Sequence, residues 1–465
     1  MQSSHAAAAV DIAFDDPNLV ADAGLVPVMA LAERIGLPEL VAERVAITGA
    51  ANSAGANPAA KVLSLLAGMV AGADSIEDMD RLRHAGNGVV FDGIRAPSTL
   101  GTFLRAFTHG HVQQLNAVLR TALVALAERT PLLPGAEEVV FVDLDSTHRQ
   151  VYGYAKQGAA VGRLKGRKTL HPLIATASTP ISRPVAVAIR LRKGRAADVR
   201  GADRLLAEAL ATVRTIAPSA RIVVRADSKS CTADVAATAA RYDADVSLTA
   251  GANPSIHAAI ARIPDTAWRP IHYPDAFVDT GTGELVSDAE VAEIPYTAFV
   301  SRPAAQQATG RLIVRRVKRR NPTTAPGQDG LFEIWRHHAV FVTGGVEMLQ
   351  AESQHRDHAI IEQVFADAAG SALAHLPSGS FAANAAWSVL WAIAHNLTRA
   401  AGCLAGTFHA RATTSAIRAH LINVPARLAR SARRITLHLP RSWPWQPAWQ
   451  ALHAALRQPP QHHAA

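Results

Sequence analysis

Cysteines, long apolar runs and aromatic residues are scarce in this sequence, and each scarcity excludes a class of protein. The two cysteines, Cys231 and Cys403, cannot supply a disulfide scaffold or a multi-cysteine zinc site. No stretch approaches about 18 uninterrupted apolar residues, so we expect no transmembrane helix and no membrane partner. No basic region precedes the apolar stretch 6–10, which argues against a signal peptide and predicts a cytoplasmic protein. Aromatic residues make up 5%, too few to favour RNA binding by base stacking.

Positive charge, by contrast, is in excess. The 465 residues include 47 Lys and Arg against 38 Asp and Glu, which gives a formal net charge of +9 and an isoelectric point near 10.0. Hydrophobic residues make up 49% of the chain, enough to bury a sizeable core. This balance favours an anionic partner, and nucleic acid is the commonest one.

The pattern of apolar residues divides the chain into segments. Residues 1–135 are typical of an all-helical region. Residues 136–250 follow the order three strands, a helix, a strand, a helix and a strand, which matches the mixed sheet of the α/β ribonuclease H-like fold. Residues 251–345 are turn-rich and strand-like, and they predict a β-rich insertion. Helices return in residues 346–405 and would complete the core, and residues 406–465 read as a basic tail.

Two aspartates end apolar runs that are typical of buried strands. Asp145 ends the run that begins at Val139, and Asp227 follows the run that begins at Arg221. In the ribonuclease H-like order these strands are neighbours, so the two carboxylates would lie a few ångströms apart. A divalent cation relieves the repulsion within such a pair, and Mg²⁺ prefers oxygen ligands. Two such ions can activate a nucleophile and stabilise the leaving oxygen of a phosphodiester.

A third carboxylate is expected from a later helix, and Glu362 is the best candidate. It neighbours the core face formed within residues 361–365, at a position that we expect to be partly buried. Asp143 points to the same side of its strand as Asp145, so it could support that carboxylate or replace it as the ligand. The plainer alternative is that each aspartate caps a strand end and that Glu362 is a solvated helix residue.

Basic residues gather in two places, and both predict contacts with DNA. A glycine-rich loop at residues 148–168 suits backbone phosphates, and a dense cluster occupies residues 315–320. The alternatives are a solvated mobile loop and a charged edge strand. Arg225 shares a side of its strand with Asp227 and either contacts a phosphate or neutralises the acids. The predicted DNA contacts are Lys156, Arg163, Lys165, Arg167, Lys168, Arg225, Arg315, Arg316, Lys318, Arg319 and Arg320.

Other catalytic chemistries lack their motifs. The sequence has neither the Gly-x-Ser-x-Gly elbow of serine hydrolases nor the phosphate-binding loop of nucleotide hydrolases. His355 and His358 lie close before Glu362, but a zinc site needs more ligands at metal spacing, and none are apparent there.

Several short motifs occur in a set order between about residues 20 and 405. They are Ala96 to Gly101, Asp143 to Thr147, Val151 to Ala159, His171 to Leu173, Val224 to Ser228, His358 to Asp367, Pro377 to Gly379 and Phe381 to Trp387. The ordered set resembles bacterial insertion-sequence transposases, and specifically the thirteen-eighty family, a relative of the insertion-sequence-four group.

The resemblance implies a DDE catalytic core whose triad is Asp145, Asp227 and Glu362. These three residues would hold two Mg²⁺ ions, for which Mn²⁺ could substitute. The enzyme would cut at the terminal inverted repeats of a transposon, and the freed 3′-hydroxyl would attack target DNA, as in cut-and-paste transposition. The resemblance also implies double-stranded DNA as the partner, a homodimer in the DNA complex, and binding of the repeats by the N-terminal helical region.

The last catalytic helix departs from the pattern of the insertion-sequence-four enzymes. Those enzymes carry Tyr, Arg, Glu and Lys, whereas this chain has His355, His358 and Ala369 around Glu362. His358 is therefore a further candidate phosphate contact. Residues 229–230 are Lys-Ser where relatives place a glycine and an aromatic residue. Two alternatives stay open, namely an inactive transposase relic that binds specific DNA sequences and a metal-dependent DNA nuclease without strand transfer.

Overall fold

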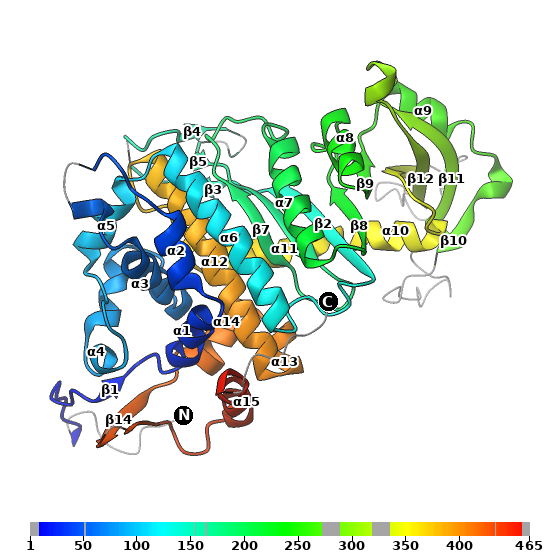
Figure 1. Ribbon diagram of the computed structural model, residues 1–465. Coiled ribbons are helices and arrows are strands. Elements are labelled where there is room, and N and C mark those ends of the chain that lie inside the picture. Colours follow the sequence, from blue (N-terminus) through cyan, green and yellow to red (C-terminus); the bar gives the residue numbers. More distant parts are fainter. Residues whose placement is uncertain are drawn as a thin grey trace.

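A nine-stranded mixed sheet runs through the centre of the molecule, in the order β10-β11-β12-β13-β9-β8-β2-β6-β7 (Figure 1). The computed structural model describes residues 9–50, 53–153, 155–162, 164, 166–271, 289–318, 335–432 and 434–457, with the backbone alone for Lys318. The strands are β2 (Val139–Ser146), β6 (Leu173–Ser178), β7 (Val185–Arg190), β8 (Arg221–Ala226), β9 (Ala244–Ala250), β10 (Arg269–Ile271), β11 (Ala289–Ala298), β12 (Ala308–Lys318) and β13 (Trp335–Val342).

The half of the sheet from β7 to β9 has the predicted topology. Strands β2, β6 and β7 form an antiparallel meander, and β8 and β9 then pair in parallel on the other side of β2. Helices α7 (Ala202–Ile216) and α8 (Ala233–Arg241) make the crossovers. Strands β2, β6, β7 and β8 are almost wholly buried, which is why their sequences are nearly continuous apolar runs. The predicted mixed sheet flanked by helices is confirmed.

The predicted β-rich insertion lengthens this same sheet. Strand β13 pairs antiparallel with β9, and β12, β11 and β10 follow outward. Helix α9 (Pro254–Ile260) packs on one face of the extension, and α10 (Met348–Arg356) packs on the other. The insertion therefore has small cores of its own but is joined to the catalytic half through backbone hydrogen bonds.

Helices dominate the chain before β2, as predicted. They are α1 (Leu25–Arg34), α2 (Leu37–Arg44), α3 (Pro58–Ala71), α4 (Asn87–Val90), α5 (Pro97–Arg105) and α6 (His109–Arg129). The region is not all-helical, because the short strand β1 (Leu19–Val20) precedes them. One continuous hydrophobic core extends from α1 through the sheet to Leu452. The domain boundaries proposed from sequence stay predictions, since the helical layer and the sheet share this core.

Helix α12 (Phe381–Ala405) is the common support of both layers, and most of its residues are buried. It contacts α6 and α3 on one side and β7 on the other. The side-chain amide of Asn396 pairs with the backbone of the edge strand β7 as a neighbouring strand would. Its Oδ1 accepts a hydrogen bond from the Ala186 amide at 2.9 Å, and its Nδ2 donates to the Ala186 carbonyl at 2.7 Å. Within the described ranges, no helix combines the length and apolarity of a membrane span.

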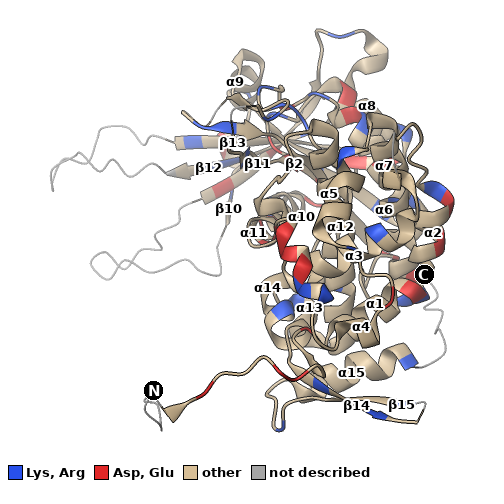
Figure 2. Ribbon diagram, turned by 90° about the vertical axis from the view of Figure 1, so that its left-hand side faces the viewer, with Lys and Arg blue, Asp and Glu red and all other residues tan. Residues whose placement is uncertain are grey.

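The segment predicted as a basic tail is folded over most of its length. Its elements are α13 (Thr407–Arg411), α14 (Thr414–Ile417), β14 (Ala426–Ser431), β15 (Arg434–His438) and α15 (Gln446–Arg457). Strand β14 pairs with β1, so a strand from near each end of the sequence joins one small sheet at the lower end of the molecule in Figures 1 and 2. Helix α15 packs against α12 and α1, so the C-terminal residues contribute to the main core.

Candidate active site

Asp145 and Asp227 lie side by side at the carboxyl ends of two parallel strands. In the register of β2 and β8, Asp143 is opposite Arg225 and Leu144 is opposite Ala226. Asp145 and Asp227 are the next residues on their chains, and both are half-buried. The two apolar runs thus place both aspartates at the edge where the sequence analysis expected them.

The surroundings of Asp145 disfavour its charged form. Its pKa is raised to about 6, mainly by burial and in smaller part by the negative charges of Asp227 and Glu362. The amide of Ser146, which donates to Oδ1 at 2.6 Å, and the nearby His358 act in the opposite direction. All three predicted acids therefore stand within electrostatic range of one another around Asp145.

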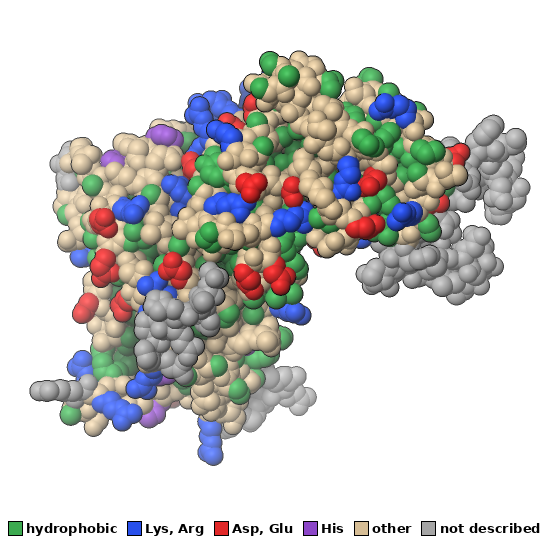
Figure 3. All heavy atoms as spheres, turned by 45° about the vertical axis from the view of Figure 1, so that its right-hand side comes forward, with side chains coloured by type: hydrophobic (Ala, Val, Ile, Leu, Met, Phe, Trp, Pro, Cys, Tyr) green, Lys and Arg blue, Asp and Glu red, His purple; other side chains and the backbone are tan. Residues whose placement is uncertain are grey.

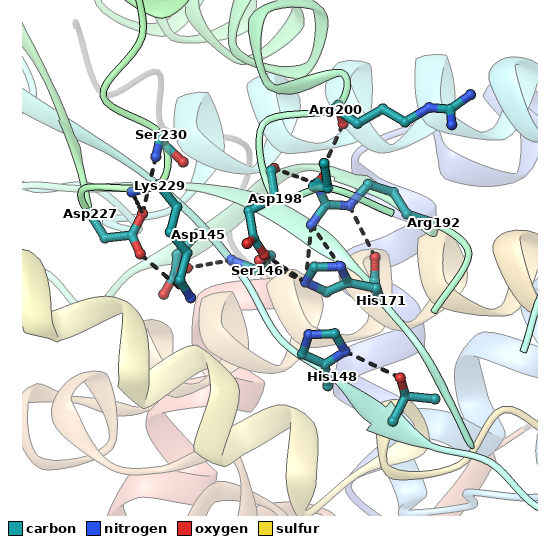
Figure 4. Close-up of polar contacts among 12 residues, drawn as sticks. Asp145, Ser146, His148, His171, Arg192, Asp198, Arg200, Asp227, Lys229 and Ser230 are labelled. Carbon is teal, nitrogen blue, oxygen red and sulfur yellow. Dashed lines mark hydrogen bonds and ion pairs between the residues drawn. The ribbon is translucent and has the colours of Figure 1, made fainter. Parts of the chain in front are cut away.

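Asp227 is held by the turn that follows β8. Its Oδ1 accepts hydrogen bonds from the amides of Lys229, at 3.1 Å, and Ser230, at 3.3 Å. The Lys229 ammonium lies 3.8 Å from Oδ2, and its side chain extends toward Asp145 (Figure 4). Asp227 does cap a turn, as the plainer alternative held, but it also faces Asp145 across the strand ends.

Glu362 comes from the helical segment after the sheet extension. Helix α10 is followed by a 3-10 turn (Asp357–Ile360) and by α11 (Ile361–Ala369), and Glu362 lies in the first turn of α11. The expectation of a partly buried position is wrong, because the residue is exposed. Its side chain leaves the core because Ile361, Val364 and Phe365 fill the buried face of this helix.

Asp143 has its charge balanced within the protein. It is fully buried, and Arg225 binds it through two hydrogen bonds of 2.7 Å from Nε and Nη2. Nδ1 of His358 lies 2.8 Å from the same carboxylate. These partners favour the prediction that Asp143 supports Asp145, over the alternative that Asp143 replaces Asp145 as the metal ligand. The same contact holds His358 next to the acids.

The prediction that Arg225 contacts DNA is wrong for this structure. The side chain is 1% exposed, lies over the Phe141 ring at 4.1 Å and donates through Nη1 to the Gln354 carbonyl at 2.7 Å. Arg225 therefore neutralises Asp143, which is the alternative that the sequence left open, and it also connects β8 to α10.

A second polar cluster beside Asp145 escaped the sequence analysis. His148, His171 and Asp198 place one potential ligand atom each within 4.8 Å of one another, a spacing at which a metal ion could bind. In the described part of the chain, the triad Asp145, Asp227 and Glu362 does not meet that spacing. The sequence signal for this cluster is the His171-Pro172 dipeptide, because a proline interrupts strand pairing between β5 (Lys168–Leu170) and β6.

A buried arginine opposes metal binding at this second cluster. Nη2 of Arg192 lies 3.4 Å from Nδ1 and 3.2 Å from Nε2 of His171, and burial together with this charge lowers the pKa of His171 to about 4. Nε2 of His171 instead lies 2.9 Å from the Ser146 hydroxyl. Arg192 and His171 thus form a chain of contacts that ends at Ser146, whose backbone amide, and not its hydroxyl, donates to Asp145 (Figure 4). We call this chain the relay.

The predicted basic loop forms a small sheet of β3 (Arg149–Gln150), β5 and β4 (Ala160–Val161). Lys156 donates to the Leu376 carbonyl, and Arg167 is exposed and donates to the Gln150 side chain at 3.2 Å. Lys168 is exposed, whereas Arg163 and Lys165 lie outside the described residues. DNA contact by this loop stays a prediction.

The second basic cluster is engaged with acids where it is described. Arg315 lies 3.7 Å from Glu352, and Arg316 lies 2.6 Å from Glu290, with its guanidinium over the Trp268 and Trp335 rings. Lys318 is described by its backbone alone, and Arg319 and Arg320 lie outside the described residues. DNA would have to displace these carboxylates, so this contact also stays a prediction.

Comparisons with known proteins bear on the whole chain. No curated protein sequence matches it. A solved structure, the cryo-EM structure of the piggyBac transposase synaptic complex with hairpin DNA, is similar over 95% of this chain and 83% of that chain, at 9% identity and a TM-score of 0.42. The family model described as "Transposase DDE domain group 1" matches residues 2–461. The chain therefore belongs to the DDE transposases, a family of divalent-metal-dependent enzymes.

Proposed function

We propose that this transposase cuts at the terminal inverted repeats of its element and joins the freed 3′-hydroxyl ends to target DNA, by a cut-and-paste route. Within the DDE transposases, the motifs around Asp145 and Asp227 support placement in the thirteen-eighty family. The observation that carries the proposal is the pair of aspartates at adjacent strand ends, with the pKa of Asp145 raised by burial and by its acidic neighbours.

In this proposal Asp145, Asp227 and Glu362 hold two Mg²⁺ ions, for which Mn²⁺ can substitute. Their oxygen-only donor set suits a hard cation. The pKa of Asp145 is raised mainly by burial and then by the acids around it, and a bound cation would stabilise the charged form against both. When bound, the ions would activate a nucleophile and stabilise the leaving oxygen.

The chain's own residues fix the orientation of the two aspartates. The Ser146 amide holds Asp145, and the amides of Lys229 and Ser230 hold Asp227. Arg225 and His358 balance Asp143 behind them, so the charge left uncompensated lies at the strand ends. Preorganisation of this kind lowers the cost of gathering like charges around a cation.

Double-stranded DNA is the proposed partner, and two-ended synapsis supports a homodimer in the DNA complex. The loop residues Lys156, Arg167 and Lys168 lie on the segment that directly follows Asp145, which supports phosphate contact near the acids. The proposed working place is the bacterial cytoplasm, at the nucleoid when DNA is bound.

A plasmid cleavage assay tests the proposal. The substrate is a supercoiled plasmid with the gene's native flanks, incubated with Mg²⁺ or with EDTA. Wild type is compared with Asp145→Asn, Asp227→Asn and Glu362→Gln, and Asp234→Asn, which changes an exposed aspartate on α8, is the matched control. We expect metal-dependent cuts at discrete flank positions from wild type and the control, and none from the other three.

The two alternatives give different products. Cutting without joined strands would identify a metal-dependent nuclease. Specific binding of the flanks with no cutting in any metal would identify a DNA-binding relic and overturn the proposal.

A further inference from the structure

The charge of the chain is very unevenly distributed. After Asp367 the sequence contains no Asp or Glu, and its basic residues are Arg399, Arg411, Arg418, Arg427, Arg430, Arg433, Arg434, Arg441 and Arg457. These nine arginines account for the whole formal net charge of +9, because the rest of the chain has 38 Lys and Arg against 38 Asp and Glu. The attraction that the composition predicts for an anionic partner is thus concentrated in residues 368–465.

The strands β14 and β15 display part of this charge as an antiparallel ribbon, which we call the C-terminal ribbon. Strand β15 is its free edge, since β14 pairs with β1 on the other side. In Figures 1 and 2 the ribbon lies at the lower end of the molecule, whereas the sheet extension lies at the upper end. On the face shown in Figure 3, the lower end displays Lys and Arg side chains and no Asp or Glu.

The two faces of the ribbon differ sharply. On the inner face, Leu428 is buried and Leu437 is half-buried, and both pack in a small cluster with Val20. This cluster holds the ribbon against the body. The outer face is formed by three cross-strand pairs whose side chains are all exposed, namely Arg427 with His438, Ala429 with Thr436, and Ser431 with Arg434.

The outer face is basic, small and able to form hydrogen bonds. Arg427 has one acidic neighbour, Asp16, at 3.1 Å. Within the described residues, no carboxylate pairs with Arg434. Charged side chains on an edge strand that served only to keep the protein soluble could be of both signs, so acidic residues among these arginines would do no harm to that role. Among the described residues, Asp16 is the one carboxylate that pairs with this face, and this scarcity of acids points to an anionic ligand.

Double-stranded DNA fits this face best. The major groove admits a two-stranded antiparallel ribbon, and Arg, Ser and Thr are residues that contact phosphates and base edges. We propose that the outer face of the C-terminal ribbon is a second DNA-binding surface of this transposase, separate from the acid site. It would bind duplex DNA at a distance from the cleavage point, and so contribute to the selection of the DNA sequence that is cut. The proposal rests on the proposed function for the identity of its ligand.

Duplex binding without cleavage tests the ribbon. Fluorescence anisotropy would follow a labelled duplex of the native flank in EDTA, as a function of salt. The test variant is Arg427→Ala with Arg434→Ala, which removes both arginines of the outer face. The matched control is Arg204→Ala with Arg241→Ala, two exposed arginines on α7 and α8. Thermal melts would establish that each variant is folded.

We expect the ribbon variant to bind the duplex at least about tenfold more weakly, with a log–log salt slope shallower by about 2, one for each lost phosphate contact. The control should match wild type. Equal affinity and slope in the ribbon variant would overturn the proposal, as would a wild-type preference for single-stranded RNA or anionic vesicles over the duplex.

The ribbon and the proposed function can fail separately. If the ribbon variant loses duplex affinity but no protein cuts the plasmid, the ribbon stands and the proposed cleavage fails. If wild type cuts the flanks while the ribbon variant binds normally, the cleavage stands and the ribbon proposal fails.

Discussion

Asp143 and Asp145 lie two residues apart on β2 and face the same side of the sheet, but their surroundings are opposite. Asp143 is fully buried against the guanidinium of Arg225 and the ring of His358. Asp145 is half-buried and has the acids Asp227 and Glu362 as neighbours. The fold itself supplies the counter-charge at the first carboxylate. At the second it gathers negative charge that a bound cation would balance.

The comparison predicts its largest effect at the second carboxylate. Asp145→Asn should lower the rate of flank cleavage by about 10³-fold or more, because a ligand of the catalytic cations is lost. The variant should be at least as stable as wild type, since no buried partner is left behind. Initial rates with Mg²⁺ and urea unfolding would measure the two quantities. A cleavage rate within about tenfold of wild type would remove Asp145 from the site.

Substitution of the first carboxylate should affect the fold instead. Asp143→Ala should lower the free energy of unfolding by about 3–5 kcal/mol, because the buried guanidinium of Arg225 loses its counter-charge. Combining it with Arg225→Met should recover a large part of this loss, since no buried charge remains. Urea denaturation of the single and double variants measures both. A loss below about 1 kcal/mol would show that the pair is not a structural ion pair.

The two carboxylates should also differ in how stability depends on pH. The folded-state pKa of Asp145, about 6, lies above the ordinary value of 3.8. Asp145 therefore favours the folded state most below pH 4, and this contribution is lost as the pH rises through about 6. Without metal, Asp145→Asn should gain about 1–3 kcal/mol relative to wild type between pH 4 and pH 7. Unfolding midpoints across this range would measure the gain, and Mg²⁺ should reduce it.

The smallest effect is expected at the relay behind Asp145. Ser146→Ala removes the hydroxyl that anchors Ser146 to His171, so the backbone amide that holds Asp145 is less firmly positioned and affinity for Mn²⁺ should fall about tenfold. Stability should change by less than about 1 kcal/mol. Calorimetric titration with Mn²⁺ measures the change, and Ser228→Ala, at an exposed serine next to Asp227, is the control. Unchanged affinity would restrict the relay to a packing role.

The catalytic half was predictable because its signals are local. The runs Val139 to Leu144 and Arg221 to Ala226 are apolar because both faces of these strands are buried, and each run ends at an aspartate. Their order along the chain leaves few topologies for a mixed sheet. The local pattern therefore gave the position of Asp145 and Asp227 as well as the strands.

Features that depend on distant partners were not predictable. Nothing in residues 335–342 indicates that they pair with β9 and extend the central sheet. Which sheet edge a strand joins depends on residues far away in the sequence. From the sequence alone, Arg225 resembles an exposed charged residue. It is buried because the fold places Asp143, Gln354 and Phe141 around its side chain. The folding of the basic tail likewise depends on β1, which lies at the other end of the chain.

Mn²⁺ binding is the most direct test of the central claim, because the molecule offers two rival cation sites. Electron paramagnetic resonance titration would compare wild type with Asp145→Asn, Asp227→Asn and Glu362→Gln, and with Asp198→Asn from the histidine cluster. We predict that the first three variants lose Mn²⁺ affinity and that Asp198→Asn retains it. Loss of binding in Asp198→Asn, with normal binding in the other three, would contradict the account and move the cation to His148, His171 and Asp198.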